Sequence, residues 1–172
     1  PYTRKMARQA VQLIHDNLLE AYEHGDDMRA RRNMLLAAYK AGVAFTRSYV
    51  GYVHAIAHSL GGRYGIPHGL ANAIILPVVM EYNAPYTGEK YREIARAMGV
   101  EGVDAMTQEE YRKAACDAVR KLGQDVGIPA DLKAIVKDED VQFLAESAFA
   151  DACRPGNPRD TSVEEIAALY RS

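Results

Sequence analysis

Apolar residues recur at helical spacing along almost the whole of this 172-residue chain. Steps of three and four positions place apolar side chains on one face of a helix. No run of alternating Val, Ile or Thr is long enough to predict a strand. The pattern therefore predicts an all-α fold, a helical bundle that forms a single domain over residues 1–172.

Start and stop signals divide the pattern into successive helices. The predicted helices cover residues 3–23, 27–46, 51–60, 69–82, about 88–98, 107–125, 130–136, 139–151 and 162–170. Thr3 is the predicted N-cap of the first helix, and Asp26 or Asp27 that of the second. Gly61 and Gly62 are predicted to end the third helix, because glycine adopts the left-handed conformation that a helix end needs.

Further signals refine the later helices. Pro77 predicts a kink or a restart within 69–82, because proline lacks the backbone N–H that a helix interior needs. Thr107 with Glu110, and Ser162 with Glu165, have the spacing of capping boxes. The apolar stripe of the second helix is predicted to consist mainly of Met28, Met34, Leu35, Ala38, Tyr39 and Ala41.

Composition excludes several classes of partner. The formal net charge is −2 and Lys and Arg are spread along the chain, so no nucleic-acid partner is expected. No apolar run reaches about 18 residues, and no membrane-spanning helix is expected. Cys116 and Cys153 form no CxxC pair, and two free thiols are typical of a cytoplasmic protein. Because the first residue is Pro1 rather than Met, we expect a piece of a longer chain.

The candidate chemistry is concentrated in residues 41–83, which contain three of the five histidines. His54 and His58 are four positions apart, and on a helix they lie on one face, about one turn from each other. His68 follows after a glycine-rich break. Neutral imidazole is the commonest side-chain metal ligand, and it also serves as a general acid or base near neutral pH. We therefore interpret this stretch as half of a metal site.

The spacing leaves alternatives open. Ala55 stands where a zinc-protease HExxH helix needs its Glu, so that mechanism is excluded. A metal could be chelated by His54 and His58 or by His54 and His68, and the three imidazoles could instead only hydrogen-bond in a helical core. A catalytic divalent site usually has three or more protein ligands. No Asp or Glu accompanies these histidines at the needed spacing, so the site is incomplete within 172 residues.

The segments AGVAF and GYVHAIAHSLGGRYGIPHGLANAIILP resemble the iron-containing (group III) alcohol dehydrogenases. The similarity is close over 41–83 and looser over the rest of the chain. In that family an N-terminal nucleotide-binding α/β domain precedes an all-helical, dehydroquinate synthase-like C-terminal domain. The resemblance implies that this chain is the C-terminal domain without its α/β partner.

The resemblance also implies roles for individual residues. His54 and His68 match two of the family's four metal ligands, and the other two, an Asp and a His, would precede Pro1. His58 matches the histidine that relays a proton, and it is the implied catalytic residue. Phe45 and Cys153 match substrate-pocket positions of lactaldehyde reductase-like and butanol dehydrogenase-like members.

The implied activity is the interconversion of a primary alcohol and its aldehyde. It would use NAD or NADP, bound mainly by the missing domain, and Fe2+ or Zn2+. The 172 residues alone would be inactive, and the full-length enzyme would form a homo-oligomer. Arg47 and Tyr49 replace residues that are small or Asn in many members, which affects substrate size and polarity. The alternatives are a zinc-dependent glycerol dehydrogenase, a dehydroquinate synthase-like enzyme, or a non-catalytic helical module.

Overall fold

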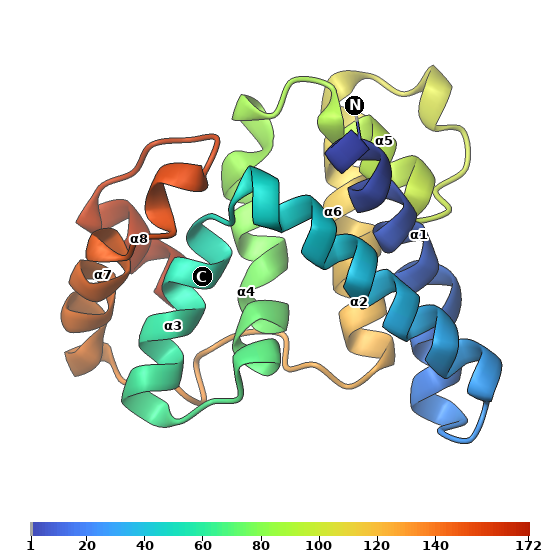
Figure 1. The fold of residues 1–172 in the computed structure, drawn as a ribbon. Helices are drawn as coiled ribbons and strands as arrows, with labels where there is room; N and C mark the ends of the chain where they lie inside the picture. The colour runs from blue at the N-terminus through green and yellow to red at the C-terminus, as the bar shows by residue number, and fades with distance from the viewer. Residues whose placement is uncertain (1) are drawn as a thin grey trace. The chain divides into compact units, whose positions relative to one another are not determined.

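The computed structural model describes residues 2–172, and all regular secondary structure in this range is helical. The prediction of an all-α fold is therefore confirmed. Short 3-10 turns lie at Ala84–Tyr86 (η1), Val103–Ala105 (η2), Asp138–Asp140 (η3) and Arg154–Gly156 (η4). The α-helices are α1 (Tyr2–Glu23), α2 (Met28–Ser48), α3 (Tyr52–Tyr64), α4 (His68–Asn83), α5 (Lys90–Ala97), α6 (Gln108–Asp125), α7 (Val141–Ala150) and α8 (Val163–Arg171) (Figure 1).

The helices group into two compact units, and each unit is described by itself. Unit 1 comprises the chain up to Ser48 together with Thr87–Val126, and therefore contains α1, α2, α5 and α6. Unit 2 comprises Tyr49–Tyr86 and Gly127–Ser172, and contains α3, α4, α7 and α8. The organisation of residues 1–172 as a single domain stays a prediction. None of the helices described is both long and apolar enough to cross a membrane.

In unit 1, α1 and α2 pack side by side through small residues (Figure 1). The fully buried positions of the pair are Ala10, Ala30, Ala37 and Ala44. The sequence prediction for the stripe of α2 was largely wrong, because its large members are exposed. Their exposed fractions are 73% for Met28, 74% for Leu35 and 69% for Tyr39. Alanine lets two helix backbones approach closely, and the larger apolar side chains then lie on the opposite side of α2.

In unit 2, α3 packs against both α4 and α7, and α7 packs against α8. The core between them combines large and small apolar side chains, which is how close-packed interiors fill space. Its most buried large members are Tyr52, Ile56, Leu60, Ile74, Ile75, Val79, Val141, Leu144 and Ile166. The buried hydroxyl of Tyr170 on α8 is satisfied by Ser59 and by the carbonyl oxygens of Ile56 and Leu144. Helix α3 therefore has the central place in this unit.

The carboxamide of Asn157 joins three segments of unit 2. Its Oδ1 accepts hydrogen bonds from Tyr52 N at 3.3 Å and from Asn83 Nδ2 at 2.9 Å. Its Nδ2 donates to Asn83 Oδ1 at 2.7 Å and to the Arg159 carbonyl at 2.9 Å. The loop after α7 is thus tied to the beginning of α3 and to the end of α4. Gly51 permits this close approach, because a Cβ there would lie 2.7 Å from Asn157 Oδ1.

The end of α3 differs from the prediction. Gly61 and Gly62 lie inside the helix, which continues to Tyr64 and ends at Gly65. Gly65 has φ of 67° and donates its N–H to the Gly61 carbonyl at 2.9 Å. The residue that adopts the left-handed conformation is therefore the third glycine of the segment.

Two other local predictions were wrong. Helix α1 already includes Thr3, which is therefore not its N-cap. Residues 130–136 form turns rather than a helix, with Ile135 and Val136 both donating to the Leu132 carbonyl. Helix α4 runs from His68 through Pro77 without a restart, and the alternative of a kink at Pro77 stays a prediction. In contrast, Asp27 Oδ1 accepts the N–H groups that open α2, and both predicted capping boxes are present in the structure.

A buried carboxylate connects the end of α3 to the start of α7. Asp140 accepts a hydrogen bond from Arg63 Nη2 at 2.6 Å and one from the Tyr64 hydroxyl at 2.7 Å. The Tyr64 hydroxyl in turn accepts from Lys137 N at 3.1 Å. The hydrogen bond from Arg63, followed by that from Tyr64, lowers the pKa of Asp140. The ionised carboxylate is therefore the form that the native structure favours.

Replacing Gly51 by Ala should destabilise the protein by about 1–3 kcal/mol, because the new Cβ would displace the Asn157 carboxamide. Gly42 is a matched control, because it lies inside α2 with no neighbouring heavy atom within 4 Å of an added Cβ. Gly42→Ala should instead stabilise the protein, by up to about 1 kcal/mol. Urea denaturation of both variants measures the two effects. Equal effects of the same sign would contradict the role given to Gly51.

Replacing Asp140 by Asn should flatten the acid limb of the stability profile. A carboxyl with a lowered pKa in the folded state binds fewer protons there than in the unfolded chain, so stability rises with pH. This stabilisation is present above the ordinary Asp pKa of about 3.9 and is lost as pH falls through the lower folded value. Asp138 is the control, because its side chain is 96% exposed. Urea midpoints between about pH 2 and 6 should lose part of their pH dependence in Asp140→Asn but keep it in Asp138→Asn.

Candidate metal and active site

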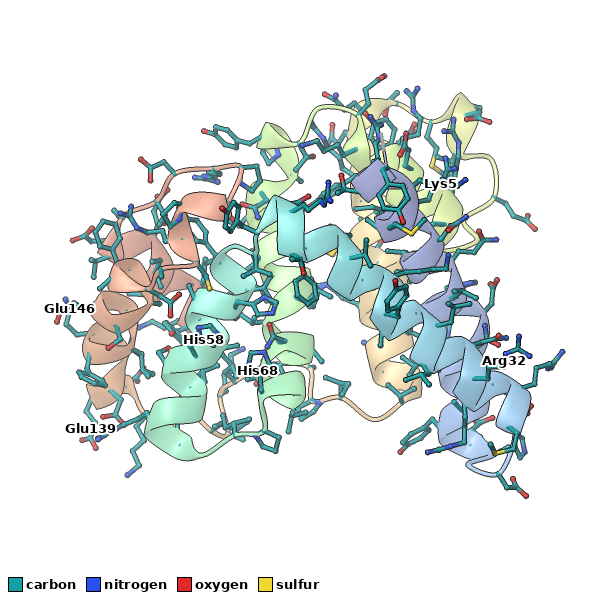
Figure 2. The ribbon with its side chains drawn as sticks, viewed as in Figure 1. Lys5, Arg32, His58, His68, Glu139 and Glu146 are labelled. Atoms are coloured by element: carbon teal, nitrogen blue, oxygen red, sulfur yellow. The ribbon has the colours of Figure 1, made fainter. Side chains whose placement is uncertain are left out.

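Two helices of unit 2 bring the three predicted histidines together. His54 and His58 project from one face of α3, while Ala55, Ile56 and Leu60 on that helix are buried in the core. His68 is the first residue of α4, directly after Pro67, which occupies the N-cap position. In Figure 2, His58 and His68 lie next to each other where α3 and α4 face one another.

The three imidazole rings form a compact cluster. The centroid of the His68 ring lies 5.4 Å from that of His54 and 5.4 Å from that of His58. The rings of His58 and His68 are stacked, with an interplanar angle of 21°. The rings of His54 and His58 are 6.1 Å apart and nearly perpendicular. The packing of α3 on α4 therefore brings all three imidazole rings into one cluster.

Burial and the neighbouring rings favour the neutral form of His54. Burial is the largest cause that lowers the pKa of His54, followed by the adjacent His68 and His58. A neutral imidazole keeps a nitrogen lone pair free for a metal ion.

Asn72, one turn after His68 on α4, contacts the same histidine twice. Its Nδ2 lies 3.2 Å from His68 Nε2 and donates to the His68 carbonyl at 2.8 Å. The Asn72 carboxamide therefore lies beside the His68 ring. The Oδ1 of Asn72 is a buried oxygen with no hydrogen-bond partner among the described residues. Polar atoms of this kind are uncommon in folded proteins and mark places where a further group can bind.

These residues fit a divalent cation. Imidazole nitrogens bind Zn2+ at about 2.0–2.1 Å, so two ligating rings must lie within a few ångströms of each other. The His54 and His68 rings meet this condition, and His54 favours the neutral state that ligation requires. The choice of His54 and His68 as the metal ligands stays a prediction, because His58 belongs to the same cluster.

Asp151 joins the cluster and was not singled out from the sequence. It follows α7 directly, and its Oδ2 lies 2.9 Å from His58 Nδ1. Its Oδ1 accepts a hydrogen bond from Cys153 N at 2.7 Å. Burial acts to raise the pKa of Asp151, but the hydrogen bonds from Cys153 and His58 outweigh it, and the net pKa is lowered. Asp151 and His58 are 93 positions apart, and no local motif signals that they meet.

The thiol of Cys153 also lies near His58. One ligand atom from each of His58, Asp151 and Cys153 lies within 4.8 Å of the others. Burial, followed by a hydrogen bond with Asp151, raises the pKa of Cys153 and keeps the thiol protonated. Both carboxylate oxygens of Asp151 already accept hydrogen bonds, so we interpret this triad as a hydrogen-bonded group rather than as a further metal site.

Phe45, the second predicted pocket residue, belongs to unit 1. It lies near the end of α2 and is half exposed. Arg47 and Tyr49 follow within four residues, and Tyr49 has φ of 60°. The roles of Phe45 and Cys153 in a substrate pocket stay predictions.

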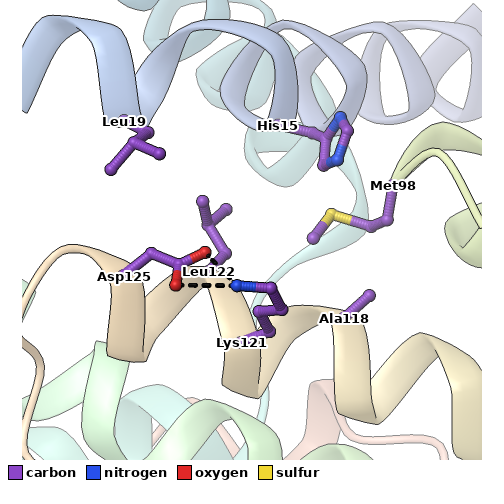
Figure 3. A pocket seen from close by; sticks show the side chains of 7 residues that line it. All are labelled: His15, Leu19, Met98, Ala118, Lys121, Leu122 and Asp125. Atoms are coloured by element: carbon purple, nitrogen blue, oxygen red, sulfur yellow. Dashed lines mark hydrogen bonds and ion pairs between the residues drawn. The ribbon is translucent and has the colours of Figure 1, made fainter.

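A separate pocket of about 230 Å³ lies in unit 1, between α1 and α6 (Figure 3). It is lined by His15, Leu19, Met98, Ala118, Lys121, Leu122 and Asp125. Its polar side chains already have partners, because Lys121 pairs with Asp125 at 2.8 Å and His15 Nδ1 lies 3.0 Å from Asp16 Oδ1. The histidine cluster of unit 2 is therefore the better candidate for chemistry.

Clustered histidines on facing helices are typical of helical domains that hold a metal ion. The chain belongs to the Fe-containing alcohol dehydrogenase family, because the model of that family's C-terminal domain matches residues 1–172. This confirms the resemblance found in the sequence and the assignment of the fold to the helical domain of these enzymes.

Characterised relatives are similar over most of the chain. Lactaldehyde reductase of Escherichia coli (strain K12) is 50% identical over 147 residues, which are 85% of this chain and 38% of that protein. The 1,3-propanediol dehydrogenase of Klebsiella pneumoniae is 42% identical over 172 residues, covering 99% of this chain and 44% of that protein. The crystal structure of a 1,3-propanediol oxidoreductase matches with a TM-score of 0.96 at 41% identity, over 99% of this chain and 45% of that one. The chain thus spans less than half the length of these relatives.

Proposed function

We propose that this chain is the helical part of a metal-dependent and NAD(P)-dependent alcohol dehydrogenase. The enzyme would interconvert a primary alcohol and its aldehyde. The observation that carries the proposal is the cluster of His54, His58 and His68, with ring centroids 5.4–6.1 Å apart, in a chain of this family. The relatives named above are reductases or dehydrogenases of small oxygenated molecules by their names, which supports the same class of substrate.

In this proposal His54 and His68 hold the metal ion, Fe2+ or Zn2+. When bound, this ion supplies a Lewis acid that polarises the oxygen of the alcohol or aldehyde. A bound nicotinamide cofactor would supply the hydride chemistry of the interconversion. The protein residues orient these groups and move the proton.

His58 is the proposed catalytic residue. Oxidation of the alcohol releases one hydride and one proton, and His58 accepts the proton and passes it to water. In the reverse direction His58 supplies a proton to the oxygen of the aldehyde. Its side chain is 42% exposed, so the imidazole can exchange protons with solvent. His54 lies one helical turn away, which places the proton carrier beside the proposed metal ligand.

The 172 residues contain two of the ligands that we propose, and two are too few for a catalytic site. We therefore expect the isolated chain to bind metal weakly and to lack turnover. Phe45 and Cys153 are proposed to line the substrate pocket. The use of NAD or NADP, a cytoplasmic location and a homo-oligomeric state follow from the sequence expectations and stay predictions.

Replacing His54 or His68 by Ala in the full-length protein should remove a metal ligand. Each variant should lose most of its bound metal, which elemental analysis after gel filtration measures. Its turnover of a primary alcohol should fall by at least about 10²-fold. His15→Ala is the control, because His15 lies in unit 1 beside Asp16. Near wild-type metal content in both cluster variants would rule out the ligand assignment. An assay with glycerol tests the alternative of a glycerol dehydrogenase.

Replacing His58 by Ala should separate proton transfer from metal binding. The full-length variant should retain its metal, whereas kcat should fall by roughly 10²- to 10⁴-fold, the range for loss of a general acid or base. Steady-state kinetics with a primary alcohol, together with metal analysis, gives both quantities. An unchanged kcat would exclude His58 from the reaction, and loss of the metal would instead identify it as a ligand.

A further inference from the structure

The geometry points to Asp151 as the positioning residue that fixes the orientation and the tautomer of His58. This inference rests on the proposed role of His58 as the proton carrier. It concerns the contact between His58 Nδ1 and Asp151 Oδ2, which are 2.9 Å apart.

The carboxylate of Asp151 determines which ring nitrogen carries the proton. An ionised carboxylate only accepts hydrogen bonds, so the facing His58 Nδ1 must be the donor. A neutral imidazole with hydrogen on Nδ1 has its free lone pair on Nε2. Nε2 is therefore the atom that accepts the proton from the alcohol. The resulting imidazolium then releases a proton to water, and Asp151 stays ionised throughout.

Asp151 is itself held rigidly, which positioning requires. Its backbone N–H donates to the Ala148 carbonyl at 3.2 Å, and its carbonyl accepts from Arg154 N at 3.1 Å. Its Oδ1 is occupied by Cys153 N, which leaves Oδ2 directed at the imidazole. The side chain of Asp151 is 19% exposed, compared with 42% for His58.

The packing of α7 on α3 brings this carboxylate to the histidine. Ala145 and Ala148 on α7 and Ala55 on α3 are fully buried members of the shared core. Asp151 follows α7 by one residue, so its position is set by this helix packing. A carboxylate that orients a histidine while staying ionised has the same part in serine proteases, where Asn in its place produces the wrong tautomer.

The test replaces Asp151 by Asn in the full-length protein. The Asn oxygen can still accept the Cys153 N–H, and the amide NH₂ then faces His58 Nδ1. This reverses the polarity of the contact, and the ring should change to the tautomer with hydrogen on Nε2. Asp131→Asn is the matched control, because Asp131 Oδ1 accepts from Lys133 N at 2.9 Å in the same type of turn, with no histidine as partner among its described contacts.

The first readout is the tautomer of His58, from long-range ¹H–¹⁵N NMR of protein labelled at histidine and assigned with His58→Gln. Wild type and Asp131→Asn should show the proton on Nδ1, and Asp151→Asn should show it on Nε2. The proton on Nε2 in wild type overturns the inference even if the variant fails to fold. The same tautomer in wild type and Asp151→Asn also overturns it.

The second readout is steady-state kinetics with a primary alcohol, together with metal content. Asp151→Asn should lower kcat by about 10²-fold or more, with KM within about twofold and metal content unchanged. A kcat within about twofold of wild type overturns the positioning role. If the wild-type protein oxidises no alcohol, the proposed function fails, and the tautomer measurement still decides the Asp151–His58 contact.

Discussion

The hydrogen bonds of the Asn157 carboxamide fix the beginning of α3, and the candidate site depends on that position. One side chain satisfies the first N–H of α3, the buried amide of Asn83 and the Arg159 carbonyl. A buried amide that lost these partners would cost about 1–3 kcal/mol, so the junction resists displacement. Gly51 and Gly156 leave room for it, because a Cβ at either position would collide with the facing segment. The register of α3 sets where its histidines project.

Helix α3 has two functions that compete for its surface. Ala55, Ile56 and Leu60 fill the core of unit 2, whereas His54 and His58 must remain accessible to α4 and to Asp151. One helix can meet both requirements, because the core residues and the histidines lie on different faces of α3, which has 3.6 residues per turn. The hydrogen bonds of Asp140 fix the far end of the same helix. Polar contacts thus hold both ends of α3. Asn157, which follows α7, holds the beginning of the helix, and Asp140, which directly precedes α7, holds its end.

The cluster combines groups with different electrostatic preferences. Burial and neighbouring rings favour a neutral His54, and hydrogen bonds favour an ionised Asp151. A neutral imidazole suits a metal ion, and an ionised carboxylate suits an imidazole that carries a proton. In the proposed mechanism, the metal ion would be held by His54 and His68, and the proton would be carried by His58 beside Asp151. This division of roles is what the proposed dehydrogenase chemistry requires of the helical domain.

The sequence by itself determined all but one of the predicted helices, both capping boxes and the three histidines, because these are local signals of period, spacing and residue type. It could not determine the buried face of α2, where alanines rather than Met28, Leu35 and Tyr39 form the contact, because the partner helix selects the face. The end of α3 at Gly65, rather than at the predicted Gly61 and Gly62, was likewise decided by backbone geometry. Only the tertiary structure brought Asp151 to His58, because packing of α7 on α3 joins residues 93 positions apart.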